Sequence, residues 1–180
     1  MMEKDKTRTL VLAALMAALT YITTTVVKIP TPTMGYVHIG DSFVLLSGII
    51  LGPVTGGLSA GIGSMLSDLL GGYPLWAPGT FTVKLLTAMV AGQVYKRLHL
   101  SAKALISGIA GEVVMIIGYF LYNIVMLTIF NAGSEAVTLY AAVVQSFTEI
   151  PFNVAQAVVG IAIASVLLPV LKRIPMKITA

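Results

Sequence analysis

Long apolar stretches, separated by short breaks rich in proline and glycine, run through this 180-residue chain. Such stretches constrain the fold, because a helix needs about 20 mainly apolar residues to cross a hydrocarbon core of ~30 Å. Apolar residues make up 57% of the chain and charged residues only 10%, whereas a soluble domain carries roughly 25% charged residues. The sequence therefore predicts an all-α integral membrane bundle of six transmembrane helices, a multi-pass protein of the cell membrane.

The breaks predict a single domain, 1–180, with helices at about 7–27, 39–51, 54–70, 80–95, 102–130 and 136–171. Prolines and paired glycines stop helices, and Pro30, Pro32, Gly52-Pro53 and Gly71-Gly72 mark the predicted breaks. The basic N-terminus could imitate a secretory signal, but the apolar run that follows it is longer than the apolar core of a signal peptide. We expect this run to be retained as the first helix.

The basic residues predict how the helices are oriented. Nine of the eleven lysines and arginines fall on one side of a six-helix topology, and an excess of cations marks the cytoplasmic side. These nine are Lys4, Lys6, Arg8, Lys96, Arg97, Lys103, Lys172, Arg173 and Lys177. We therefore expect both termini to be cytoplasmic, with outer loops at 28–38, 71–79 and 131–135.

Five ionisable residues lie within the apolar stretches: Asp41, Asp68, Lys84, Glu112 and Glu149. Each costs roughly 2.5 to 3.5 kcal/mol at the centre of a spanning helix, so a chain that keeps several of them is expected to use them. The group favours a polar pocket inside the bundle, and the first three are expected near its outer surface. A buried structural ion pair between Lys84 and one of the acids is the simpler alternative.

Three polar residues on the last predicted helix form the strongest site signal. Glu149, Asn153 and Gln156 are separated by four and three residues, so they share one helical face. Pro151 removes a backbone hydrogen bond beside Glu149 and is expected to kink the helix there. This face is predicted to line a central cavity.

The predicted substrate-binding residues combine aromatic rings with carboxylates and amides. Rings can hold a flat ligand, and excess negative charge favours a ligand with donors or a partial positive charge. The pattern therefore suggests a small, polar, planar molecule, although the aromatic residues could instead form an interfacial belt. The predicted residues are Tyr36, His38, Asp41, Trp76, Lys84, Glu112, Tyr119, Tyr122, Asn123, Glu149, Asn153 and Gln156.

Several functions are disfavoured by what the chain lacks. Without cysteine there is no thiol nucleophile, and the two histidines, His38 and His99, fall on opposite sides of the predicted membrane, so no metal site or cofactor is expected. The cations cluster at helix ends rather than on a phosphate-binding face, which argues against nucleic acid. A glycine-rich phosphate loop is also missing, so ATP binding is not expected.

Two alternatives come from other functional classes. An intramembrane enzyme could use His38 with Asp41, or Ser64, but no nucleophile, base and orienting group fall at one depth. A bundle that only serves as a scaffold would need the polar side chains of the last helix to satisfy one another. We therefore expect no catalytic residues.

Small residues recur at four-residue spacing in 52–64 and in the first helix, where they allow two backbones to approach closely. In the first helix the two possible registers are Ala13 with Ala17 and Ala14 with Ala18. The simpler interpretation is that these small residues pack helices together within the bundle. A smooth alanine stripe can also face another membrane protein.

Three segments carry a resemblance to a known family: GYVHIGD at 35–41, WAPGTFTVK at 76–84 and EIPFNVAQ at 149–156. Together they resemble the substrate-binding S components of energy-coupling factor (ECF) vitamin transporters, most like the subgroup with the riboflavin and the hydroxymethylpyrimidine or pyridoxine S components. The resemblance implies a six-helix protein that captures a B vitamin or precursor from outside.

The same resemblance implies partners. The subunit would dock on a transmembrane coupling protein driven by two ATPase subunits and release its cargo inward. It assigns the docking seam to Ala13 and Ala17, with Ala14 and Ala18 as the other register, and makes the loop 28–38 a lid. The many carboxylates and amides favour a pyridoxine- or hydroxymethylpyrimidine-like cargo, with riboflavin as the alternative.

Overall fold

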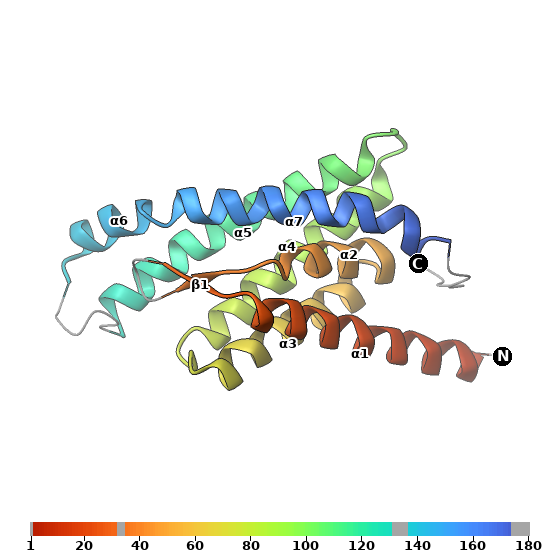
Figure 1. The fold of residues 1–180 in the computed structure, drawn as a ribbon, viewed down its shortest axis with the longest axis horizontal. Helices are drawn as coiled ribbons and strands as arrows, with labels where there is room; N and C mark the ends of the chain where they lie inside the picture. The colour runs from red at the N-terminus through yellow and green to blue at the C-terminus, as the bar shows by residue number, and fades with distance from the viewer. Residues whose placement is uncertain (1, 32–34, 131–136, 174–180) are drawn as a thin grey trace.

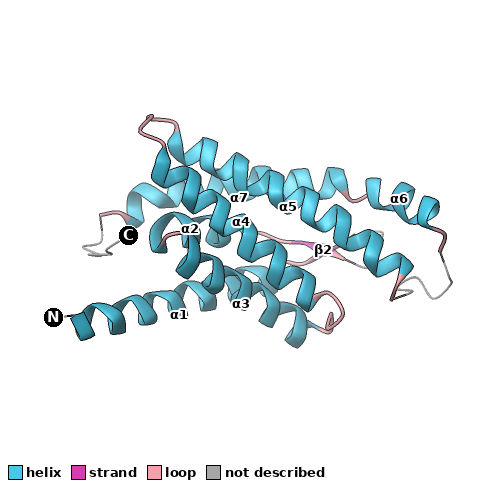
Figure 2. Ribbon diagram, turned by 180° about the vertical axis from the view of Figure 1, so that it is seen from behind, coloured by secondary structure: helices cyan, strands magenta, loops and turns pink. Residues whose placement is uncertain are grey.

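The computed structural model describes residues 2–31, 35–130 and 137–173. The chain forms α1 (Met2–Val26), β1 (Ile29–Pro30), β2 (Tyr36–Val37), α2 (Asp41–Leu51), α3 (Pro53–Gly71), α4 (Ala77–Arg97), α5 (Lys103–Thr128), α6 (Leu139–Phe147) and α7 (Ile150–Leu171). Helices α5 and α7 run along one side of the molecule and α1 along the other, with α2 and α4 between them (Figures 1 and 2). This architecture confirms the predicted all-α membrane bundle.

Three helical stretches are long and apolar enough to cross a membrane: 6–26, 103–128 and 139–172. Helix α2 is apolar but has only 11 residues. Helices α3 and α4 are long enough to span but less apolar, and the polar residues that lower their hydropathy, such as Asp68 and Lys84, are buried inside the bundle. The polar content of the central helices is therefore kept away from lipid.

The last predicted helix, 136–171, is two segments in the structure. Helix α6 ends at Phe147, and α7 begins at Ile150 with Pro151 in its first turn, where the missing proline N–H costs no hydrogen bond. If α6 and α7 are counted as one interrupted helix, the described residues hold six helices. The break puts Glu149 at a junction rather than inside a regular helix.

The predicted first outer loop, 28–38, contains a short hairpin. Strands β1 and β2 pair antiparallel, with Ile29 opposite Val37 and Pro30 opposite Tyr36, an element that the all-α prediction did not include. Lys28 fixes the base of the hairpin, because its Nζ donates to the carbonyl of Ser67 at 3.2 Å. Desolvation lowers the pKa of Lys28, and attraction to Asp68 opposes this shift.

Small residues on α3 let α1 approach closely. The Ser59 hydroxyl donates to the Ala13 carbonyl at 2.5 Å, and a side chain at Gly63 would collide with the backbone carbonyl of Ala17. Spacing of this kind is typical of tight helix pairs in membranes. Ala13 and Ala17 therefore belong to an internal seam between α1 and α3.

The start of α1 and the end of α7 lie at the same end of the molecule, called the terminal end below, with the hairpin and α6 toward the other end (Figures 1 and 2). An apolar core cluster that includes Met16, Leu45, Leu46 and Leu168 packs α1, α2 and α7 together. The apolar core thus lies toward the terminal end, and the polar residues lie beneath the hairpin.

Candidate functional site

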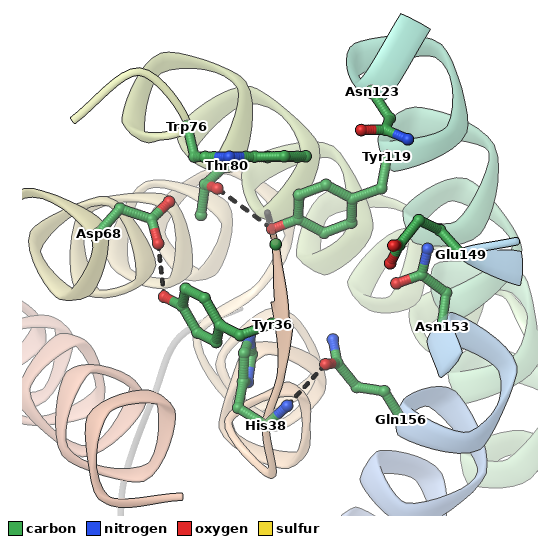
Figure 3. Close-up of a pocket in the computed structure, with 11 residues that line it drawn as sticks. Tyr36, His38, Asp68, Trp76, Thr80, Tyr119, Asn123, Glu149, Asn153 and Gln156 are labelled. Atoms are coloured by element: carbon green, nitrogen blue, oxygen red, sulfur yellow. Dashed lines mark hydrogen bonds between the residues drawn. The ribbon is translucent and has the colours of Figure 1, made fainter. Parts of the chain in front are cut away.

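A pocket opens beneath the hairpin, with an empty volume of about 510 Å³ that includes space open to solvent. Its wall comes from the hairpin, α3, α4, α5 and the start of α7 (Figure 3). The lining residues are Gly35, Tyr36, His38, Asp68, Trp76, Thr80, Tyr119, Asn123, Glu149, Asn153 and Gln156. Aromatic faces and polar groups from distant parts of the chain thus meet in one space.

Tyr36 holds the hairpin against α3. Its hydroxyl donates to Asp68 Oδ1 at 2.5 Å, and its ring lies 4.8 Å from that of Tyr73, between centroids. Lys28 Nζ lies 4.3 Å from the centroid of the same ring, a cation–π contact. Burial and the neighbouring Asp68 raise the pKa of Tyr36, so the phenol remains a hydrogen-bond donor at neutral pH.

His38 ends the hairpin and is buried as a neutral imidazole. Its backbone N–H donates to Gln156 Oε1 at 2.8 Å, and its Nδ1 accepts from the backbone N–H of Gly40 at 3.0 Å. Desolvation, together with the positive charge of Lys84, lowers its pKa to about 3. Because Nδ1 is an acceptor, the ring proton resides on Nε2.

Aromatic side chains of α4 and α5 form one wall. The ring centroids of Trp76 and Tyr119 are 6.4 Å apart, and Tyr119 donates to the Thr80 hydroxyl at 3.3 Å. Tyr122 packs edge-on against Trp76, with centroids 5.8 Å apart, and donates to the Leu75 carbonyl at 2.7 Å. Tyr122 therefore braces Trp76 from outside the pocket lining.

The opposite wall is the polar face predicted for the last helix. Glu149, Asn153 and Gln156 all line the pocket and are at most 9% exposed. Their side chains lie on the same side of the pocket in Figure 3. The i, i+4, i+7 spacing thus brings the three side chains to one side of the pocket, although helix α7 begins only at Ile150.

Two buried oxygens of the lining have no hydrogen-bond partner among the described atoms: Asp68 Oδ2 and Asn123 Oδ1. Each residue is otherwise anchored, because Asp68 Oδ1 accepts from Tyr36 and Asn123 Nδ2 donates to Ser146 Oγ at 3.1 Å. Buried acceptors without partners are costly. The site is therefore suited to a ligand that donates hydrogen bonds.

Eight of the twelve predicted site residues line the pocket, and four do not: Asp41, Lys84, Glu112 and Tyr122. Asp41 and Lys84 are both fully buried and form an ion pair beneath the pocket, which corrects the expectation that they lie near the outer surface. The acid that pairs with Lys84 is thus Asp41 rather than Asp68.

Gln156 connects this ion pair to the pocket. Its Nε2 donates to Asp41 Oδ2 at 2.6 Å, while its Oε1 accepts from the His38 backbone. Glu112 is buried in the same region, and neither of its carboxylate oxygens has a hydrogen-bond partner among the described atoms. These residues support the floor of the pocket and do not form its wall.

Three lining residues, Gly35, Asp68 and Thr80, are absent from the set predicted from the sequence. Asp68 stands out in the sequence as a buried charge, but a structural pairing with Lys84 is its simpler interpretation there. Thr80 follows Trp76 by four residues, so helical spacing places both on one face of α4, and this signal was available. Gly35 contributes only backbone and has no signal of its own beyond its place beside Tyr36.

Comparison with known proteins is consistent across sequence and fold. The profile of the family described as "ECF-type riboflavin transporter, S component" matches residues 4–173. A Pyrococcus woesei protein described as "Uncharacterized protein in gap 3'region" is 32% identical over 130 residues, which cover 72% of this chain and 85% of that protein.

A solved structure, described as "Structure and mechanism of the S component of a bacterial ECF transporter", has a similar fold. Its TM-score is 0.68 at 21% sequence identity, covering 96% of this chain and 99% of that one. At this identity the likeness speaks for the fold alone. Because the family profile spans nearly the whole chain, this protein belongs to the family described as "ECF-type riboflavin transporter, S component", whose members are membrane-embedded subunits of vitamin uptake and not enzymes.

Proposed function

We propose that this S component captures a small, planar B vitamin or precursor of the pyridine or pyrimidine class, such as pyridoxine or hydroxymethylpyrimidine. The observation that carries the proposal is the pair of unpartnered acceptors, Asp68 Oδ2 and Asn123 Oδ1, in a pocket with aromatic walls. Hydroxymethyl groups, a ring N–H and an exocyclic amine are donors that such acceptors recognise. The flat ring fits against Trp76 and Tyr119.

The charge of the lining supports the same class. Asp68 and Glu149 are acidic, the His38 imidazole is neutral at pH 7, and no lysine or arginine is among the described residues that line the pocket. An anionic ligand would have its charge unpaired in a buried site, which is costly. The pocket therefore favours the free vitamin over its phosphate ester.

Riboflavin is the second candidate, because the matching family profile carries its name. The many carboxylate and amide groups on the wall favour the smaller, more polar ring. Direct binding decides between the two.

The test is a titration of the purified protein followed by fluorescence of Trp76, which is the only tryptophan of the chain and lines the pocket. The panel holds pyridoxine, hydroxymethylpyrimidine, riboflavin and pyridoxal phosphate. We expect one of the first two to bind at submicromolar concentration and the phosphate ester to bind much more weakly. Tight binding of riboflavin alone selects the second candidate, and no binding by the whole panel rejects the proposal.

We also propose that α1 docks on a transmembrane coupling protein that two ATPase subunits drive, and that the contact uses Ala14 and Ala18. Both lie on the outward side of α1, next to the exposed apolar side chains of Val11 and Ile22. Ala13 and Ala17 are half-buried against α3, so the outward register is the alternative one. This arrangement supports a smooth outer face of α1.

The docking proposal is tested by Ala18→Trp in a transport assay with the coupling subunits present. We expect transport to be lost while the ligand affinity, measured by calorimetry, is unchanged. Leu121→Trp, at a 56% exposed position of α5, is the matched control and should transport normally. Full transport by Ala18→Trp contradicts the assigned register.

A further inference from the structure

A second, shallower hollow lies at the terminal end of the molecule, far from the hairpin. Its empty volume of about 200 Å³ includes open solvent and holds no enclosed room for a water molecule, so it is a surface groove and not an internal cavity. Helix α2 supplies Leu45 and Ile49, and the other lining residues come from the start of α5 and the end of α7: Ala104, Gly108, Ile161, Ala164, Ser165 and Leu168. The lining is apolar apart from Ser165, and small residues on both helices keep the surface between them low.

Two lysines converge beside this groove. Lys103 precedes Ala104 at the start of α5, and Lys172 follows the end of α7. Their Nζ atoms lie 4.6 and 4.7 Å from the centroid of one ring, that of Tyr95, and Lys172 also donates to the Tyr95 hydroxyl. Three helices thus bring two cations and a hydroxyl to one place.

Among the side chains that the structure describes, no acid is recorded in an ion pair with Lys103 or Lys172, and the recorded ion pair of Lys84 with Asp41 lies elsewhere. Two like charges gathered on one ring repel each other, and an anion between them would remove the repulsion. The lysines stand at the end of the bundle that the cation bias assigns to the cytoplasm. Basic pockets between helices on that side are known to bind anionic lipid headgroups.

We propose that this groove binds one anionic phospholipid, with the phosphate at Lys103, Lys172 and Tyr95 and one acyl chain in the groove. Charge complementarity selects the occupant: the groove is apolar, its mouth is cationic, and the bilayer supplies a molecule with that pattern. Gly108 is one reason for the fit, because a Cβ there would come within 3.1 Å of Ile161 Cγ1 and narrow the space. The lipid would join the ends of α4, α5 and α7, and its binding does not depend on the vitamin.

The experiment is native mass spectrometry of the full chain released from mixed micelles that contain equal amounts of dioleoylphosphatidylglycerol and dioleoylphosphatidylcholine. We expect one retained phosphatidylglycerol with clear preference over phosphatidylcholine. In the double variant Lys103→Gln/Lys172→Gln the preference should fall about 25-fold, because each lysine near an anionic headgroup contributes about fivefold. Lys6→Gln/Arg8→Gln removes the same charge at the same end, from exposed positions of α1, and should leave the preference unchanged.

A second pair of variants tests the groove itself. Ala104→Phe and, at an exposed wall position, Ser165→Phe should each reduce retention while both lysines remain. Equal retention of the two lipids by the wild type overturns the proposal, as does equal loss in the Lys6 and Arg8 control. If soluble glycerol phosphate releases the lipid and both phenylalanine variants retain it fully, the site binds phosphate but no acyl chain. If the wild type forms a dimer that disappears in those variants, the groove binds a second copy of the chain. Either result overturns the proposal.

Discussion

The two ends of this bundle differ in the polarity of their buried side chains. Beneath the hairpin, buried amides, carboxylates and aromatic rings surround a cavity, whereas at the terminal end methyl and methylene groups of Met16, Leu45, Leu46 and Leu168 fill the interior. In a bilayer the apolar end gains little from leaving lipid, so close packing stabilises it. At the polar end, buried groups without hydrogen-bond partners lower the stability of the fold, and we attribute their presence to ligand binding.

The largest expected effect comes from the ion pair between the two ends. Lys84→Met leaves Asp41 buried without its cation, and we expect it to lower the free energy of unfolding by about 3–5 kcal/mol. The double variant Asp41→Leu/Lys84→Met should recover most of this loss, because neither member of the pair is left as an unpaired charge. Thermal unfolding in detergent measures both, and a silent single variant contradicts the ion pair.

The apolar end is tested by Leu46→Ala, at a position with 0% exposure. A cavity in a packed core costs about 2–5 kcal/mol, so the midpoint of thermal unfolding should fall clearly. Ligand affinity of the molecules that remain folded should stay at the wild-type value. An equal loss of affinity would show that the two ends are not separable.

The polar end is tested by Asp68→Asn, which keeps the shape and removes the charge. We expect the vitamin to bind roughly 10- to 100-fold more weakly, since hydrogen bonds to charged groups contribute about 1.5–3 kcal/mol. Glu112→Gln makes the same chemical change outside the pocket lining and serves as the control. Calorimetric titration of both variants should separate them, and matching affinities would remove Asp68 from the site.

Acid is expected to lower the stability of the fold through His38 at the polar end. Burial lowers the pKa of His38 from 6.5 to about 3, so the unfolded chain binds a proton that the folded chain does not. Its contribution to stability is complete above pH 6.5 and declines as the pH falls toward 3. His38→Asn, which keeps an acceptor for the Gly40 N–H, should flatten the fall of the unfolding midpoint between about pH 6.5 and 4. An identical pH profile in wild type and variant would rule out this role.

The smallest effect is expected at the base of the hairpin. Lys28→Gln removes the cation above the Tyr36 ring, and a partly exposed cation–π contact contributes about 0.5–1 kcal/mol. Ligand release, followed by stopped-flow fluorescence of Trp76, should become about two- to fivefold faster. Lys6→Gln removes the same charge at an exposed site and is the control. An unchanged release rate in Lys28→Gln would show that the contact of Lys28 with the Tyr36 ring does not slow ligand release.

Much of this molecule follows from residue periodicity. The six-helix membrane bundle followed from apolar length, and the wall of Glu149, Asn153 and Gln156 followed from spacing along one helix. Depth was harder: Asp41 and Lys84 were expected near the surface, but the hairpin that covers them depends on pairing between segments that carry no strong strand pattern. The sequence pattern predicts which residues share a helical face, but it does not predict which loop covers the end of that helix.

The outward face of α1 illustrates the same limit. Two alanine registers were equally regular in sequence, and only the contact of Ser59 with the Ala13 carbonyl distinguishes the inner register from the outer one. Likewise, the break between α6 and α7 precedes Pro151, so the proline marks the restart of a helix rather than a kink inside one. Tertiary neighbours decided both cases.

The amide of Gln156 ties the end of the hairpin to the ion pair beneath the pocket. It accepts from the His38 backbone with one end and donates to Asp41 with the other, so lifting the hairpin breaks a contact that does not involve the cargo at all. Every ligand that leaves by this route must wait for the same internal rupture. Chemically different cargoes that differ widely in affinity should therefore share a ceiling on their escape rate, set by the protein alone.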